Sequence, residues 1–283
     1  MPSNSTPLRF ISGILLYAFV AWVMLGAHEY FMLTLLAVLA VLIGWEWFEM
    51  ILAKYKKYLS PLLLAPILIS FFALEYTANN PIGKYYMTTL GGVWFIFAML
   101  QTANYELNPR HNLHSPARQI VATIINLVNA IVLISIFLYF TVILFTVSRE
   151  LAFAVFTMVC ICDTGGFIFG RWIGGRKIAK NLSPNKTFSG AAGSTCLTVL
   201  AYVIMTTIFT DLPSNILIIA LIIPFSIMLQ CGDLYQSILK RRASIKDSGS
   251  IIPGHGGIFD RTDSLLWSPF PFYLILELCG YAF

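Results

Sequence analysis

Long apolar runs separated by short polar segments make up most of the chain. These runs lack the alternation of apolar and polar residues that marks a membrane β-strand, so we expect helices. Each run approaches the roughly 20 residues that a helix needs to cross about 30 Å of hydrocarbon. The pattern predicts about nine transmembrane helices, over residues 10–28, 30–48, 59–75, 86–102, 120–146, 150–170, 190–209, 214–232 and 264–282.

Composition supports this fold class. Of the 283 residues, 58% are hydrophobic and only 11% are charged, whereas a soluble domain usually has about 25% charged residues. We therefore expect an all-α, polytopic membrane protein. The first run is too long for a cleaved signal peptide and lacks a small-residue cleavage site, so it is expected to stay as an anchor.

The lysines and arginines predict the orientation. If the N-terminus lies inside, every lysine and arginine except Lys84 and Arg149 falls in an inner segment, as in most membrane proteins. This predicts a cytoplasmic N-terminus and a basic inner surface that attracts anionic lipids or substrates. The short chain, without an ER or transit signal, favours a bacterial inner (cytoplasmic) membrane, with the active site facing the cytoplasm.

The chemistry is unevenly distributed along the chain. Residues 1–148, with about five predicted spans, carry few informative polar groups, and Glu46 and Glu49 are expected to lie at the membrane interface. Residues 149–283, with about four spans and polar loops on the cytoplasmic side, form the expected catalytic part. The five cysteines all lie in or at apolar runs, in a spacing typical of core thiols rather than of a zinc site.

The first polar cluster is DTGGFIFGRWIGGRK, residues 163–177. Asp163 is about 20 Å along its predicted span, where an ionised carboxylate costs roughly 2.5–3.5 kcal/mol. Asp163 must therefore face a partner or a wet cavity. Gly166, Gly170 and Gly174 follow on the same helix face, and close helix packing would explain them without any function.

The second cluster is NLSPNKTFSGAAGS, residues 181–194. Pro184 interrupts the chain, and hydroxyl groups, a lysine and free backbone amides precede a predicted helix. That combination suits an anion. The order of residues differs from that of a P-loop, and a loop of this composition is by itself a weak signal.

The third cluster follows the eighth predicted span. Asp233, Ser237, Lys240 and Ser244 share one stripe if that helix continues beyond the membrane. Carboxylates before the ninth predicted span, in the segment GHGGIFDRTD, would then meet Asp233 at the inner interface. Carboxylates, cations and glycine-rich backbone together suit magnesium and polyphosphate, although surface salt bridges would explain the arginine–aspartate pairs alone.

These residues resemble a known family. The segment from Ser237 to Asp263 matches, at every fixed position, the signature of the phosphatidate cytidylyltransferases, also called CDP-diacylglycerol synthases. The stretches DTGGFIFGR and LSPNKTFSG are similar to two further motifs of that family. The resemblance implies transfer of CMP from CTP to phosphatidic acid, with magnesium and a second metal ion nearby. It also implies membrane lipid as a partner and no nucleic acid; a homodimer is compatible with the sequence.

The resemblance also implies roles for individual residues. The implied metal ligands are Asp233 and Asp260. The implied catalytic residues are Ser237, Lys240, Arg241, Asp260 and Arg261. The implied substrate-binding residues are Asp163, Ser183, Lys186, Thr187, Lys246, Asp247, His255, Gly256, Gly257 and Asp263. Gln236 and Phe188 depart from the family pattern, because many members have an acidic residue at each position.

Two other functions stay open from the sequence. A CTP-dependent lipid-alcohol kinase, of the polyprenol type, would need the same basic, magnesium-binding inner surface. A transporter could use Asp163 and Glu277 as charges inside the membrane. The absence of a repeat and the concentration of charge at one interface disfavour the transporter.

Overall fold

The computed structural model describes residues 5–51, 80–107, 116–243, 245, 247–249 and 257–281. Helices dominate, and the two strands have only three and five residues. The elements are α1 (Ser5–Gly26), α2 (Glu29–Ile51), α4 (Pro81–Leu107), α5 (Pro116–Val147), α6 (Arg149–Trp172), β1 (Lys177–Ala179), β2 (Ser183–Thr187), α7 (Phe188–Ile208), α8 (Ile216–Arg242), the 3₁₀ turns η1 (Phe259–Arg261) and η2 (Leu265–Trp267), and α9 (Pro269–Leu278).

The prediction of an all-α membrane protein is confirmed. Within the described ranges, five helices are long and apolar enough to cross a bilayer: α2, most of α5, α6, α7 and α8. Helix α8 continues to Arg242, so Asp233, Ser237 and Lys240 do lie on one continuous helix. The predicted span at 59–75 falls outside the described residues.

The predicted span at 264–282 is wrong as a single helix. The chain instead forms η2 and then α9, which has only 10 residues. At 1.5 Å per residue such a helix is about 15 Å long, half of the hydrocarbon thickness. Pro269 and Pro271 give the reason, because proline fits the first turn of a helix but disrupts its interior.

The polar segment after α6 folds into a short hairpin that the sequence pattern did not predict. Helix α6 ends at Trp172, and Gly174 follows in the turn with a positive φ of 66°, which suits glycine. Strands β1 and β2 then pair antiparallel, with Lys177 opposite Thr187. Thr187 also caps α7, because its hydroxyl accepts a hydrogen bond from the Gly190 amide at 3.1 Å. The hairpin thus holds the second polar cluster against the start of α7.

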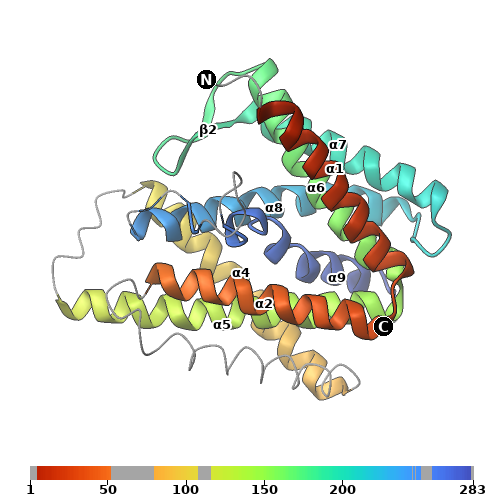
Figure 1. Ribbon diagram of the computed structural model, residues 1–283, viewed down its shortest axis with the longest axis horizontal. Coiled ribbons are helices and arrows are strands. Elements are labelled where there is room, and N and C mark those ends of the chain that lie inside the picture. The colour runs from red at the N-terminus through yellow and green to blue at the C-terminus, as the bar shows by residue number, and fades with distance from the viewer. Residues whose placement is uncertain are drawn as a thin grey trace.

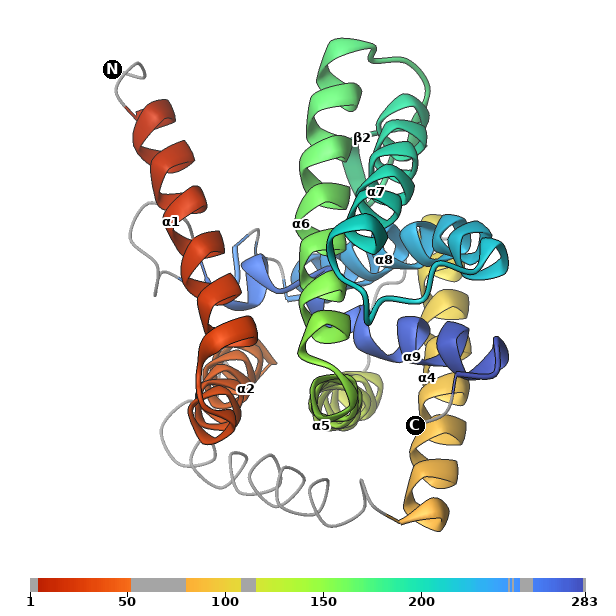
Figure 2. The same cartoon turned by 90° about the vertical axis from the view of Figure 1, so that its right-hand side faces the viewer.

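Helices α6 and α7 pack closely along their length (Figure 2). A Cβ atom at Gly190 would lie 2.8 Å from the Gly166 carbonyl oxygen, so the two backbones approach where glycine permits it. Close packing therefore does explain part of the glycine pattern after Asp163. Gly174 belongs to the turn beyond the helix and takes no part in that contact.

Helices α2 and α5 run side by side, and α8 passes above them in Figure 1. The segment with η1 and η2 is held against them by buried aromatic rings. Phe259 packs on Trp47 of α2 with ring centroids 4.8 Å apart. Trp267 packs on Trp94 of α4 at 4.8 Å and on Tyr235 of α8 at 5.3 Å. These contacts fix both ends of the segment that carries Asp260 and Asp263.

Candidate active site

A polar cavity of about 680 Å³ lies where α6, the hairpin, α7, α8 and η1 meet. It brings together residues from all three polar clusters of the sequence. The charged side chains that line it are Asp163, Arg171, Lys177, Lys186, Asp233, Asp260, Arg261 and Asp263.

Asp163 faces this cavity from α6. Its carboxylate accepts a 2.8 Å hydrogen bond from the Ser264 hydroxyl, which follows η1 in the chain. The side chain stays accessible through the cavity although it lies deep within a helix that is long enough to cross the membrane. The structure thus gives Asp163 a hydrogen-bond partner and places it at a polar cavity, in line with the expectation of a partner or a wet cavity.

Lys186 of β2 connects the hairpin to α8. Its ammonium group lies 2.5 Å from the Asp233 carboxylate and donates to the Gln230 carbonyl at 3.2 Å. A cation and a carboxylate that lie 47 positions apart in sequence therefore meet on one wall of the cavity. The hydroxyl of Thr187 is occupied as the α7 cap, so the hairpin contributes mainly its lysines to the cavity.

Asp260 is held by three donors. One carboxylate oxygen accepts from Lys240 at 2.9 Å, and the other accepts from the backbone amides of Ser248 at 2.7 Å and Gly257 at 3.3 Å. Burial alone would raise the pKa of this carboxyl, but the Lys240 contact and the two amides outweigh it and lower the pKa below its ordinary value. Asp260 is thus stabilised as an anion at the rim of the cavity.

The surroundings of Asp263 shift its pKa in the opposite direction from that of Asp260. Burial raises its pKa well above the ordinary value, and the negative charges of Asp233 and Asp163 raise it further. Lys240 and the Ser264 amide, which donates at 2.9 Å, offset only part of this. Three carboxylates therefore gather in this part of the cavity.

Several predicted residues lie outside the cavity lining. Ser237 donates to the Asp233 carbonyl within α8 at 3.0 Å, and Arg241 and Asp247 are exposed. Ser183 lies in β2, opposite Ala179 of β1. Lys240 and Gly257 are not part of the lining either, but both donate to Asp260, which is. Lys246, His255 and Gly256 fall outside the described residues.

The two departures from the family pattern have different surroundings. Gln236 is fully buried, and its amide nitrogen donates to the Asp263 carbonyl at 3.4 Å. Its amide oxygen is buried without a hydrogen-bond partner. Phe188 is 54% exposed and lies beneath the Arg176 guanidinium, 5.9 Å from the ring centroid. Gln236 therefore contacts the backbone of a residue that lines the cavity, whereas Phe188 contacts an arginine just before the hairpin.

The interfacial depth expected for Glu46 stays a prediction, but the structure shows that its side chain is buried within the protein. Glu46 is 1% exposed, and its carboxylate accepts hydrogen bonds from the segment just before the cavity residues. A signal was available, because a carboxylate inside an apolar run is costly unless donors satisfy it. Glu106 at the end of α4 has a similar role, since it accepts from the Asn181 and Leu182 amides of the hairpin at 3.2 Å.

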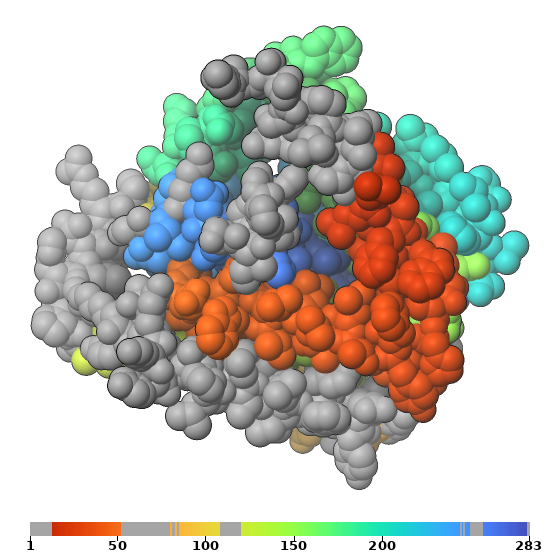
Figure 3. Space-filling model, in the orientation of Figure 1, coloured from red at the N-terminus to blue at the C-terminus, as the bar shows by residue number. Residues whose placement is uncertain are grey.

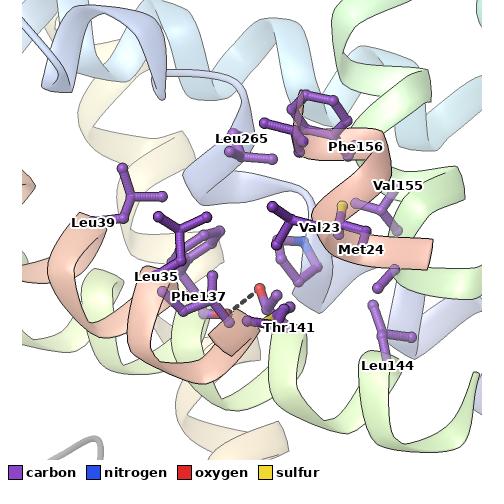
Figure 4. A pocket seen from close by; sticks show the side chains of 15 residues that line it. Val23, Met24, Leu35, Leu39, Phe137, Thr141, Leu144, Val155, Phe156 and Leu265 are labelled. Atoms are coloured by element: carbon purple, nitrogen blue, oxygen red, sulfur yellow. Dashed lines mark hydrogen bonds between the residues drawn. The ribbon is translucent and has the colours of Figure 1, made fainter. Parts of the chain in front are cut away.

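A second, smaller cavity of about 120 Å³ lies between α1, α2, α5 and α6 (Figure 4). The labelled side chains that point into it are apolar except Thr141, whose hydroxyl donates to the Phe137 carbonyl at 2.6 Å. Leu265 lines this apolar cavity, two residues after Asp263 of the polar cavity. One short segment therefore borders both cavities.

Within the described part of the chain, no group of three or more histidine, cysteine, aspartate or glutamate side chains is arranged to hold a metal ion by itself. Magnesium does not need such a group, because it binds one or two carboxylates and shares its other positions with water and phosphate oxygens. The donor set fits that requirement. Asp163, Asp233 and Asp263 are hard oxygen donors that line the same cavity.

A sequence model of the cytidylyltransferase family matches residues 7–279. The chain belongs to this family. It is also similar to proteins named phosphatidate cytidylyltransferase. That of Staphylococcus epidermidis is 44% identical over 120 residues, 42% of this chain and 45% of the relative. That of Bacillus subtilis is 42% identical over 118 residues, 40% and 42% of the two chains.

The same name is given to a Staphylococcus aureus protein, 38% identical over 113 residues, 40% of this chain and 43% of the relative. In each case the matched segment spans less than half of the relative's length. The family model, by contrast, covers nearly the whole chain.

Proposed function

We propose that the protein transfers CMP from CTP to phosphatidic acid and so forms CDP-diacylglycerol and pyrophosphate. The observation that carries this proposal is the adjacency of two cavities on one segment. Asp263 borders a polar cavity with cations and carboxylates, and Leu265 borders an apolar cavity. A phospholipid has this same division between head group and chains. The relatives' name supports the choice of CTP.

In this reaction a phosphate oxygen of phosphatidic acid attacks the α-phosphorus of CTP. The bond from that phosphorus to the bridging oxygen breaks, and pyrophosphate leaves with its electron pair. The lipid phosphate is already ionised at neutral pH, so the attack needs no strong general base. Catalysis then consists mainly of positioning and of neutralising charge.

The chain's own cations supply much of that neutralisation. Arg171, Lys177 and Lys186 line the side of the cavity formed by α6 and the hairpin, where they suit a triphosphate. Arg261 of η1 also lines the cavity and suits the departing pyrophosphate. Lys240 contributes through Asp260, whose anionic form it stabilises.

Magnesium is the proposed metal, with Asp233 as the first ligand. Asp260 was the second ligand implied by the sequence, but its oxygens already accept from Lys240 and two amides. Asp163 and Asp263 line the same cavity and accept hydrogen bonds from the Ser264 hydroxyl and amide rather than from a lysine, so they are better placed to complete the site. When bound, magnesium would neutralise phosphate charge and help to orient the two substrates.

The apolar cavity supports an acyl-bearing substrate. Its size resembles that of engineered apolar cavities of about 150 Å³, which stay dry and bind a small hydrocarbon. It would therefore hold a few methylene groups of one chain, with the remaining chain between the helices.

We place the enzyme in a bacterial inner membrane, with the N-terminus and the polar cavity on the cytoplasmic side. The distribution of lysine and arginine along the sequence supports this orientation. A homodimer is compatible with this placement.

The test uses purified protein with CTP, phosphatidic acid and magnesium. CTP labelled at the α-phosphate should transfer its label to a lipid, and CTP labelled at the γ-phosphate should release labelled pyrophosphate. Transfer of the γ-label to the lipid, with release of CDP, would instead show a lipid kinase. Substrate flux across vesicles without any nucleotide would show a transporter.

A further inference from the structure

Glu46 lies on α2, far from the polar cavity in sequence. Its side chain is buried, and burying a carboxylate is costly unless hydrogen bonds compensate. Three donors do so: the Ser248 hydroxyl at 2.9 Å, the Ile258 amide at 3.0 Å and the Phe259 amide at 2.9 Å. All three belong to the segment that leads into η1.

The glycines of this segment fit the same contact. A Cβ atom at Gly249 would lie 2.7 Å from a Glu46 carboxylate oxygen. A Cβ atom at Gly257 would overlap both the Glu46 carboxylate and the Ser248 hydroxyl oxygen. The backbone on both sides of residues 250–256 thus approaches Glu46 so closely that any side chain would displace it.

Asp260 contacts the same two parts of the chain as Glu46, those at Ser248 and at Gly257. The Ser248 amide donates to Asp260 while the Ser248 hydroxyl donates to Glu46, and the Gly257 amide also donates to Asp260. Next to Glu46, Trp47 packs against Phe259. Two carboxylates and one aromatic pair therefore fix the segment immediately before Arg261 and Asp263. The blue C-terminal residues border orange α2 in Figure 3.

We propose that Glu46 is a positioning residue for the cytidylyl transfer, an inference that rests on the proposed function. Glu46 does not line the polar cavity; it acts through the backbone of residues 257–259 on Asp260, Arg261 and Asp263. Charged groups of an active site must be held rigidly, because small displacements weaken their interaction with the charge that develops in the transition state.

The kinetic experiment compares Glu46→Gln, Glu46→Asp and Glu49→Gln in nanodiscs. Glu46→Gln should lower kcat by about 10- to 100-fold, with a much smaller change in KM for CTP, because the cavity remains but its charged groups shift. Glu46→Asp keeps the carboxylate and should recover part of that loss. Glu49, half-buried one turn later on α2, is the matched control, and its variant should stay within about twofold of wild type.

Ser248→Ala removes the donor of the Ser248–Glu46 hydrogen bond and leaves Glu46 in place. It keeps the proposal testable if a Glu46 variant fails to fold. Alone it should lower kcat by about three- to tenfold, since one hydrogen bond to a charged group is lost. In the double variant with Glu46→Gln, the loss should be smaller than the product of the two single losses, because both remove the same hydrogen bond. Independent, multiplicative losses would contradict the proposal.

Hydrogen exchange provides a readout that does not depend on activity. In Glu46→Gln the amides of Ile258 and Phe259 should exchange at least about tenfold faster, while Glu49→Gln leaves them unchanged. Faster exchange with unchanged kcat would make the contact purely structural and overturn the proposal. A wild-type protein without turnover of CTP and phosphatidic acid would overturn the proposed function instead.

Discussion

The two cavities share the segment from Asp260 to Pro269 but are built in opposite ways. The polar cavity is large and lined by eight charged side chains from α6, the hairpin, α8 and the η1–η2 segment. The apolar cavity is smaller, and its one hydroxyl group, that of Thr141, already donates to a backbone carbonyl. The polar cavity can bind by charge, and the apolar cavity only by excluding water from hydrocarbon.

This difference separates the two parts of the proposed reaction. Substitutions in the polar cavity should change turnover for every acyl chain alike. Substitutions in the apolar cavity should change the choice among acyl chains and leave the handling of CTP intact.

The largest effect is expected for Asp233→Asn. The change removes a proposed magnesium ligand and leaves Lys186 without its carboxylate partner. Turnover should fall by about a thousandfold, equally for short- and long-chain phosphatidic acid, as measured by release of pyrophosphate. Asp211→Asn, at an exposed position between α7 and α8, is the matched control and should leave turnover near that of wild type.

Asp260→Asn should lower turnover by about a hundredfold. It leaves Lys240 without its anionic partner and weakens two amide contacts of the segment. Steady-state kinetics with CTP and phosphatidic acid would measure this loss, and size-exclusion chromatography would check that the protein is folded. A loss confined to long-chain substrates would contradict the separation of the two cavities.

Val155→Phe in the apolar cavity should change selectivity rather than chemistry. The larger side chain would leave no room in the cavity for about two methylene groups of the acyl chain. Because each buried methylene group contributes about 0.8 kcal/mol, the preference for long over short chains should fall about tenfold. Competition between the two substrates measures it. Val203→Phe, on an exposed face of α7, is the control. An equal shift in that variant would show that the apolar cavity does not select the acyl chain.

Glu106→Gln should have the smallest effect, on the polar cavity alone. Glu106 holds the turn of the hairpin that carries Lys177 and Lys186. Loosening that turn should raise KM for CTP by about fivefold, with kcat and acyl preference unchanged. Glu29→Gln, exposed at the start of α2, is the control. An altered acyl preference would show that the two cavities are coupled through α4.

Much of the helix pattern could be predicted because it is local. An apolar run of about 20 residues indicates a helix regardless of its neighbours, and the prediction that Asp163 faces a partner or a wet cavity followed from the cost of a buried charge. The break before α9 was also encoded locally, in Pro269 and Pro271, but hydropathy alone conceals it.

Contacts between distant residues could not be predicted in this way. Glu46 and the amides that it binds are separated by more than 200 positions. Gly257 illustrates the same limit. The resemblance implied a substrate-binding role for Gly257, but nothing in the sequence indicated that a carboxylate of the second helix, that of Glu46, lies beside it.

The hydrogen bonds of Glu46 to Ser248, Ile258 and Phe259 also determine whether the second half of the chain can be active alone. Asp163, Lys186, Asp233, Asp260 and Asp263 all lie after residue 148, which suggests a separable catalytic unit. That unit made alone would have no acceptor for the Ile258 and Phe259 amides, nor for those of Asn181 and Leu182. The hairpin turn and residues 257–259 would therefore reach their positions only when residues 1–148 are present. Two co-expressed fragments, residues 1–148 and 149–283, should together restore activity that neither fragment has by itself.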